Sequence, residues 1–206
     1  MRRAESFLKA YRELHGKPGR VPKRRADLLR GAVVFAVAAM DAYIRDTIAS
    51  CLAKVVAARA KTGKALPRAL VKTIESAMNT ETLIKAAYAS RTGSHIRSAV
   101  EGKLAEKSFQ STKAIAEAFN IIGLDDFVSK VTNKGCFDKK DMEGKIREIT
   151  KRRHLIVHQA DLHQDKKKKR KPRNITVGFV EESLKTIRAF VEAVEEVVNE
   201  YMRGIG

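Results

Sequence analysis

Hydrophobic residues recur at intervals of three and four along most of the chain, a period typical of amphipathic α-helices. The first such stretch spans residues 3–15, and its apolar positions are Phe7, Leu8, Tyr11 and Leu14. Residues 26–61 follow as one long run of helix formers with a wide apolar face, so we expect a largely buried helix there. No segment keeps the two-residue alternation of a half-buried strand. The pattern therefore predicts an all-α fold.

Two more long helices are predicted in the second half of the chain, at residues 138–160 and 177–202. Together with residues 26–61 they form the natural core of a helical bundle. Glycine and proline divide the intervening segment 64–135 into shorter pieces. The short helices expected there are 67–78, 80–89, 94–107, 111–122 and 125–131. We therefore expect a single domain over residues 1–206, with 64–135 as a helical insertion and 161–175 as a basic loop.

The composition is that of an ordinary globular protein, because 44% of the 206 residues are hydrophobic and only four are proline. The two cysteines, Cys51 and Cys136, are far apart and lack the spacing of a zinc motif or disulfide scaffold. The chain begins with charged residues, and its longest apolar run, residues 31–40, is too short to span a bilayer. A reducing, cytoplasmic setting without a membrane is the expectation.

The net charge of the chain indicates which class of molecule it binds. The formal net charge of +18 predicts a polyanion, because basic side chains release counterions when they neutralise phosphates. Residues 1–30 carry ten Lys and Arg against three acids, and residues 166–173 carry seven bases in eight positions. The last thirty residues lean acidic instead. A nucleic-acid surface would therefore be confined to one part of the molecule.

Three of the five histidines lie in the stretch 152–163, immediately before the lysine tract. His154 and His158 are four residues apart, so on a helix their rings share one side. Such a pair serves to bind a metal, to transfer protons, or only to pack and cap a helix end. A metal site needs further ligands, and only His163 is near, so we expect neither a metal nor another cofactor.

Proton transfer at a phosphate also requires a permanent cation for the charge on the non-bridging oxygens. Arg152 and Arg153 supply guanidinium groups that match phosphate geometry. The expected nucleic-acid contacts, besides Arg152, are Lys166, Lys167, Lys168, Lys169, Arg170, Lys171 and Arg173. A solvated loop, a nuclear-import-like patch or a surface for an antitoxin protein are the alternatives for this tract.

The sequence Arg153-His154-Leu155-Ile156-Val157-His158 resembles the signature of the HEPN superfamily, in which an arginine and a polar residue precede a histidine. Residues 156–161 are similar to the RiboL-PSP-HEPN branch in particular. Residues 29–45 are similar to the first long helix of that branch, with Asp41 as the acidic residue in an apolar stretch.

This resemblance implies a HEPN-type helical bundle and a metal-independent RNA endonuclease, plausibly a toxin or anti-phage effector acting as a homodimer. It implies His158 as the group that transfers a proton, Arg153 as the cation that stabilises the phosphorane-like charge, and His154 as a phosphate contact or orienting group. The products would be a 2′,3′-cyclic phosphate and a 5′-hydroxyl. Asp41 either holds Arg153 or an imidazole in place, or pairs with Arg45 one turn away.

Arg153 and His158 are five residues apart, so a straight helix directs them to different sides. Either the helix ends or distorts near His158, or the two residues meet only across a twofold interface. Some HEPN toxins carry a tyrosine that an antitoxin modifies, and Ala160 occupies that position here. Two other functions stay open: a non-catalytic HEPN module that binds RNA or protein, and a helical DNA-binding protein.

Overall fold

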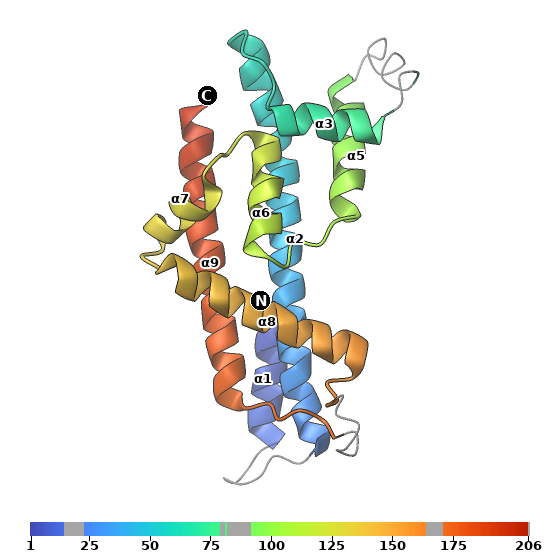
Figure 1. Cartoon of the computed structure of the whole chain (residues 1–206), viewed down its shortest axis with the longest axis vertical. Helices are drawn as coiled ribbons and strands as arrows, with labels where there is room; N and C mark the ends of the chain where they lie inside the picture. Colours follow the sequence, from blue (N-terminus) through green and yellow to red (C-terminus); the bar gives the residue numbers. More distant parts are fainter. Residues whose placement is uncertain (15–22, 79–80, 82–91, 164–170, 206) are drawn as a thin grey trace. The chain divides into compact units, whose positions relative to one another are not determined.

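A computed structural model describes residues 1–14, 23–78, 81, 92–163 and 171–205 (Figure 1). Over this part of the chain the regular structure is helical, which confirms the predicted all-α class. The helices are α1 (Arg2–Leu14), α2 (Lys23–Lys61), α3 (Arg68–Ala77), α5 (Thr92–Ala105), α6 (Thr112–Phe119), the 3-10 helix η1 (Asn120–Ile122), α7 (Phe127–Lys134), α8 (Lys139–Gln159) and α9 (Val177–Gly204). The helix predicted at 80–89 lies outside the described residues, apart from Glu81.

The chain divides into two compact units. The first comprises residues 1–40 and 137–192, and the second comprises residues 41–136 and 193–206. Both α2 and α9 contribute residues to each unit, so the single domain over 1–206 stays a prediction. Among the described helices, none combines the length and the apolar character that a bilayer crossing requires.

The first unit contains α1, α8 and the N-terminal parts of α2 and α9. Helix α1 approaches α2 closely, because a β-carbon at Gly31 would lie only 2.9 Å from the ring of Phe7. The same ring stacks on Phe35 with 5.2 Å between centroids. The ion pairs Arg12–Glu181 and Arg188–Glu5 join the exposed sides of α1 and α9. This packing forms the scaffold against which α8 lies.

The second unit holds the described short helices of the segment 64–135, which are α3, α5, α6, η1 and α7. Helix α3 packs on α5 and η1, and α6 packs on η1 and α7. The rings of Phe119 and Phe127 stack with centroids 4.3 Å apart, and Tyr201 donates its hydroxyl proton to the carbonyl of Ile122 at 2.6 Å. The described residues of the segment 64–135 therefore form packed structure with an apolar core.

Among the described helices, α2, α5 and α7 show the clearest differences from the predicted bounds. Helix α2 begins at Lys23, three residues before the expected start, because the basic residues there are themselves helical. Helix α5 spans Thr92–Ala105, where 94–107 was expected. Helix α7 begins at Phe127, after Asp126 has adopted a left-handed conformation with φ 54°. These ends depend on local backbone geometry that hydrophobic spacing does not encode.

Candidate functional site

Helix α8 carries the arginine and histidine motif, and its two halves differ in burial. The side chain of Asp138 caps the helix by accepting a hydrogen bond from the Asp141 amide at 2.8 Å. The first half buries Met142, Ile146 and Ile149 in the core of the first unit. After Ile149 every side chain of α8 is partly or fully exposed. The motif therefore lies on the half of α8 that is open to solvent.

His154 and His158 lie together, as their spacing predicted. The centroids of the two rings are 4.5 Å apart, the ring planes are tilted by 43°, and both side chains are exposed. Arg153 is partly buried, and its Nε is buried without a hydrogen-bond partner in the described part of the chain. The structure thus presents two adjacent imidazoles and a guanidinium on one turn and a half of helix.

The geometry of α8 bears on how Arg153 and His158 are directed within one chain. Helix α8 stays helical from Arg153 to His158 and ends only after Gln159. Five residues of α-helix place the two side chains about 140° apart around the axis. Within one chain the regular helix therefore directs the two side chains to different sides, and their meeting across two subunits stays a prediction.

The end of α8 is fixed by two consecutive left-handed residues, Ala160 with φ 48° and Asp161 with φ 55°. The amide of Asp161 donates to the carbonyl of Leu155 at 2.9 Å, which closes the last turn. Leu162 then pairs with Pro172 in an isolated antiparallel bridge. The chain leaving α8 is thereby held beside the segment that leads to α9.

The carboxylate of Asp161 is fully buried and joins three parts of the first unit. Its Oδ2 accepts from Arg30 Nε at 2.7 Å and from Arg152 Nη2 at 2.8 Å. Arg30 also donates to the carbonyl of Arg173 at 2.8 Å, and Arg152 donates to that of Asn174 at 2.8 Å. We call Arg30, Arg152, Asp161 and Arg173 the Asp161 cluster. It links α2, the end of α8 and the strand-like segment before α9.

Arg152 was expected to contact RNA, and the structure places it in the Asp161 cluster. Its side chain is 17% exposed, and burial lowers the pKa of its guanidinium, with Arg30 and Arg173 acting in the same direction and Asp161 opposing them. An arginine stays protonated at any ordinary pH, so the effect is a cost of burying like charges near one carboxylate. A phosphate contact by Arg152 stays a prediction.

The other expected RNA contacts are only partly described. Lys166, Lys167, Lys168, Lys169 and Arg170 lie outside the described residues. Lys171 is exposed, and its carbonyl accepts from the His163 amide at 3.0 Å. Arg173 is partly buried, and its carbonyl belongs to the Asp161 cluster.

Asp41 belongs to the second unit and forms its contacts there. One carboxylate oxygen accepts from Arg45 Nη2 at 2.8 Å, and the other accepts from the amide of Phe109. The Arg45 guanidinium also lies 5.9 Å from the centroid of the Phe109 ring. The pairing with Arg45, one of the two alternatives for Asp41, is therefore present. A role for Asp41 in holding Arg153 or an imidazole stays a prediction.

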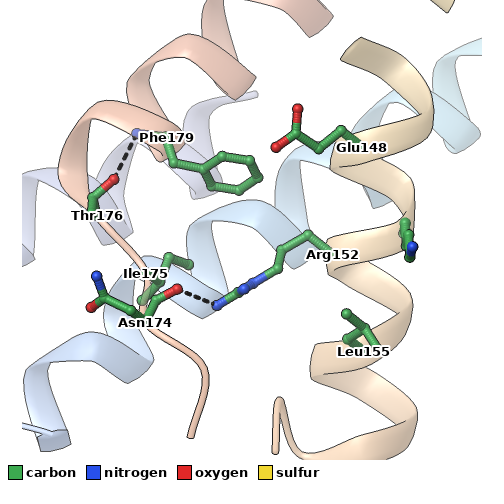
Figure 2. Close-up of a pocket in the computed structure, with 8 residues that line it drawn as sticks. Glu148, Arg152, Leu155, Asn174, Ile175, Thr176 and Phe179 are labelled. Carbon is green, nitrogen blue, oxygen red and sulfur yellow. Dashed lines mark hydrogen bonds between the residues drawn. The ribbon is translucent and has the colours of Figure 1, made fainter. Parts of the chain in front are cut away.

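A pocket of about 320 Å³ lies between α8 and the start of α9 (Figure 2). Four residues of α8 line it at the spacing of one helix face, and they are Glu148, Lys151, Arg152 and Leu155. Asn174, Ile175, Thr176 and Phe179 line the other side. The Phe179 ring extends toward α8, between the carboxylate of Glu148 and the guanidinium of Arg152. We call this hollow the α8–α9 pocket.

The sequence reasoning did not identify the α8–α9 pocket or the Asp161 cluster. Glu148, Arg152 and Leu155 follow the helical period, so the sequence does indicate that these residues share one face of α8. Its other side begins at Asn174, nineteen positions after Leu155, and no local pattern connects that segment to α8. Asp161 falls at the start of the loop expected at 161–175, and nothing in the sequence paired it with Arg30.

Comparisons with known proteins gave one match. A family model described as RiboL-PSP-HEPN matches residues 2–200, nearly the whole chain. Neither the search of curated proteins nor that of solved structures found a match. Within the described ranges, no group of three or more His, Cys, Asp or Glu side chains is arranged to hold a metal ion.

Proposed function

Since the chain belongs to the RiboL-PSP-HEPN family, we propose that it is an RNA endonuclease that cuts phosphodiesters by attack of the neighbouring 2′-hydroxyl. The observation that carries this proposal is the exposed pair His154 and His158, 4.5 Å apart on the same helical segment as Arg153. The formal net charge of +18 supports a polyanionic substrate.

In this reaction the 2′-oxygen forms a bond to phosphorus while the bond from phosphorus to the 5′-oxygen breaks. The 2′-hydroxyl gives its proton to a base, and the departing 5′-oxygen takes one up. We assign one of these transfers to His158, because its imidazole is exposed and imidazole is the side-chain group used most often in acid–base catalysis. Arg153 stabilises the charge on the non-bridging oxygens, and His154 contacts the phosphate or orients its neighbour. The products are a 2′,3′-cyclic phosphate and a 5′-hydroxyl.

This chemistry requires positioning, proton transfer and charge stabilisation, because the nucleophile is already part of the substrate. A metal ion is therefore not a requirement of the proposed mechanism. Cleavage that continues in EDTA is its expected signature.

We propose further that two copies of the chain share the site. Around α8, Val157 lies between Arg153 on one side and the two histidines on the other. Val157 is 45% exposed although it is apolar, which suits a position covered by a second copy. If two α8 helices meet there on a twofold axis, the His158 of each copy approaches the Arg153 of the other.

Cleavage of a labelled single-stranded RNA in EDTA tests the proposal. We expect wild-type protein to release fragments with 2′,3′-cyclic phosphate ends, and His158→Ala to cut at least 100-fold more slowly, because acid–base catalysis contributes about 10²–10⁴-fold. His163→Ala is the matched control, since His163 is exposed and lies in the same segment. Equal rates for wild type and His158→Ala would exclude the proposed role of His158.

The alternative is a HEPN module that binds RNA or protein without cleaving it. It predicts salt-sensitive RNA binding by wild-type protein, no fragments in EDTA, and the same affinity for His158→Ala. Retention of a gel shift without products would therefore favour binding over catalysis.

We propose a toxin or anti-phage effector as the biological role, because an endonuclease directed at cellular RNA stops translation. Expression of the wild-type gene is expected to arrest growth, and expression of His158→Ala is not. Normal growth with a wild-type protein that cuts RNA in vitro would contradict the role and leave the activity intact.

A further inference from the structure

We infer that the α8–α9 pocket is a base-binding subsite that prefers guanine, an inference that rests on the proposed function of the chain as an RNA endonuclease. Pockets that hold small ligands occupy roughly 300–1,000 Å³. The volume of about 320 Å³ is at the lower end of that range and suits a single nucleobase with part of its ribose.

The lining contains the groups that single-stranded RNA recognition uses. Unstacked bases bind on aromatic side chains and form hydrogen bonds through their Watson–Crick edges. Phe179 supplies a partly exposed ring on α9, and Leu155 supplies apolar surface on α8. Lys151 is exposed at the same pocket and provides a cation for the adjoining backbone phosphate.

The carboxylate of Glu148 gives the pocket its preference. A carboxylate only accepts hydrogen bonds, so it selects bases that present donors. Guanine presents two neighbouring donors, the N1 proton and the N2 amino group, which match the two oxygens of one carboxylate. Adenine and cytosine present one amino group beside an acceptor nitrogen, which a carboxylate repels. Glu148 is exposed and points toward the Phe179 ring, so it reaches a base placed on that ring (Figure 2).

The guanidinium of Arg152 shapes the opposite side of the pocket. Its Nη2 is held by Asp161 and by the carbonyl of Asn174, both at 2.8 Å. This anchoring gives the guanidinium a fixed position, so it does not swing to pair with Glu148 across the ring. The Glu148 carboxylate thus stays available for a base, and the Arg152 guanidinium is a positively charged group in a fixed position on the other side of the pocket.

The pocket adjoins the proposed catalytic histidines along α8. Leu155 precedes His158 by three residues, a rise of roughly 4.5 Å along the helix axis. Lys151 lies between the pocket face and the histidine face around the helix, one turn before His154 and Leu155. One nucleotide is long enough to reach from the proposed catalytic histidines to the pocket. The pocket is therefore placed to select the base next to the scissile phosphate.

Binding of RNA that cannot be cleaved tests the pocket separately from catalysis. The probes are fluorescein-labelled hexamers with 2′-fluoro riboses, which lack the attacking hydroxyl, and they carry one central G, A, C or U among uridines. Anisotropy should show about tenfold tighter binding of the G probe than of the A probe to the full-length protein. We expect Glu148→Gln to reduce the ratio to within about twofold, and Phe179→Leu to weaken binding of all purine probes.

Glu143→Gln is the matched control, because Glu143 lies on α8 outside the pocket, and it should keep the wild-type ratio. Equal affinity of wild-type protein for all four probes, or an unchanged preference in Glu148→Gln, overturns the inference. A guanine preference in a protein that never cuts RNA contradicts the proposed endonuclease and supports the pocket. Cleavage without any preference at the cut site contradicts only the pocket.

Discussion

Asp161 shows how one buried charge organises the residues around a candidate site. Its carboxylate is fully buried, and a single oxygen accepts from both Arg30 and Arg152. Two guanidinium groups that would otherwise repel each other are held side by side by that oxygen. Because Arg152 precedes Arg153 and His154 on α8, the cluster fixes the helix that carries the proposed chemistry.

Loss of the charge on Asp161 is expected to destabilise the protein strongly. Asp161→Asn removes the buried counter-charge of Arg30 and Arg152, and breaking a buried pair in this way costs about 3–5 kcal/mol of unfolding free energy. Chemical denaturation followed by circular dichroism measures the change.

Asp27→Asn is the control for Asp161→Asn, because Asp27 pairs with the same Arg30 at 3.0 Å but its side chain is 73% exposed. Exposed pairs contribute about 0–1 kcal/mol. Similar losses in the two variants would show that burial of Asp161 does not determine the strength of this cluster.

Residues close in sequence were predicted better than residues that meet through the fold. The four-residue spacing of His154 and His158 predicted adjacent rings, and their centroids are 4.5 Å apart. The contact between Arg30 and Asp161 joins positions 131 residues apart, and no spacing rule relates them. The sequence accordingly favoured Arg152 as an RNA contact, although its guanidinium is held by Asp161.

Helix α8 has a first half that is buried in the core and a second half whose side chains are exposed to solvent. Hydrophobic periodicity predicted this helix to within one residue at both ends, because Met142, Ile146 and Ile149 follow the helical period. Periodicity did not predict how the helix ends, since the left-handed turn at Ala160 and Asp161 depends on backbone conformation. That turn directs Asp161 into the interior.

The left-handed turn predicts that Ala160→Gly stabilises the protein. Ala160 has φ 48°, a conformation that costs a residue with a β-carbon about 1–2 kcal/mol and glycine almost nothing. Greater flexibility of glycine in the unfolded chain offsets part of this gain, so we expect a net increase of about 0.5–1 kcal/mol. The denaturation midpoint should rise, and RNA cleavage should not change.

A fall in the midpoint of Ala160→Gly would mean that the left-handed conformation is not kept in solution. Ala118→Gly is the converse control, because Ala118 is buried in α6 with ordinary helical geometry. There the same substitution should lower stability.

For the whole molecule, the proposed sharing of the site between subunits predicts complementation between two inactive variants. In a mixed dimer of Arg153→Ala and His158→Ala, one site loses both residues while the other keeps an intact Arg153 and an intact His158. Random exchange at equal amounts makes half of the dimers mixed, each with one working site of two. About a quarter of wild-type cleavage should therefore return.

If the mixed sample cleaves RNA no faster than either variant alone, the Arg153 and His158 of one site belong to the same chain, and the proposed sharing is wrong. Light scattering of each variant before mixing provides the control, since the argument requires that both remain dimeric. Refolding the two variants together forms mixed dimers even when subunits exchange slowly between folded dimers.

The distance in sequence between Arg30 and Asp161 has a consequence for the newly made protein. Ribosomes produce α2 long before α8, and 131 positions separate the two partners of the buried pair. A growing chain that already contains Arg30 has only the exposed Asp27 as a partner until 131 further residues have been added and Asp161 is present. The end of α8, with its two histidines, therefore acquires this support only after the helix itself has been made.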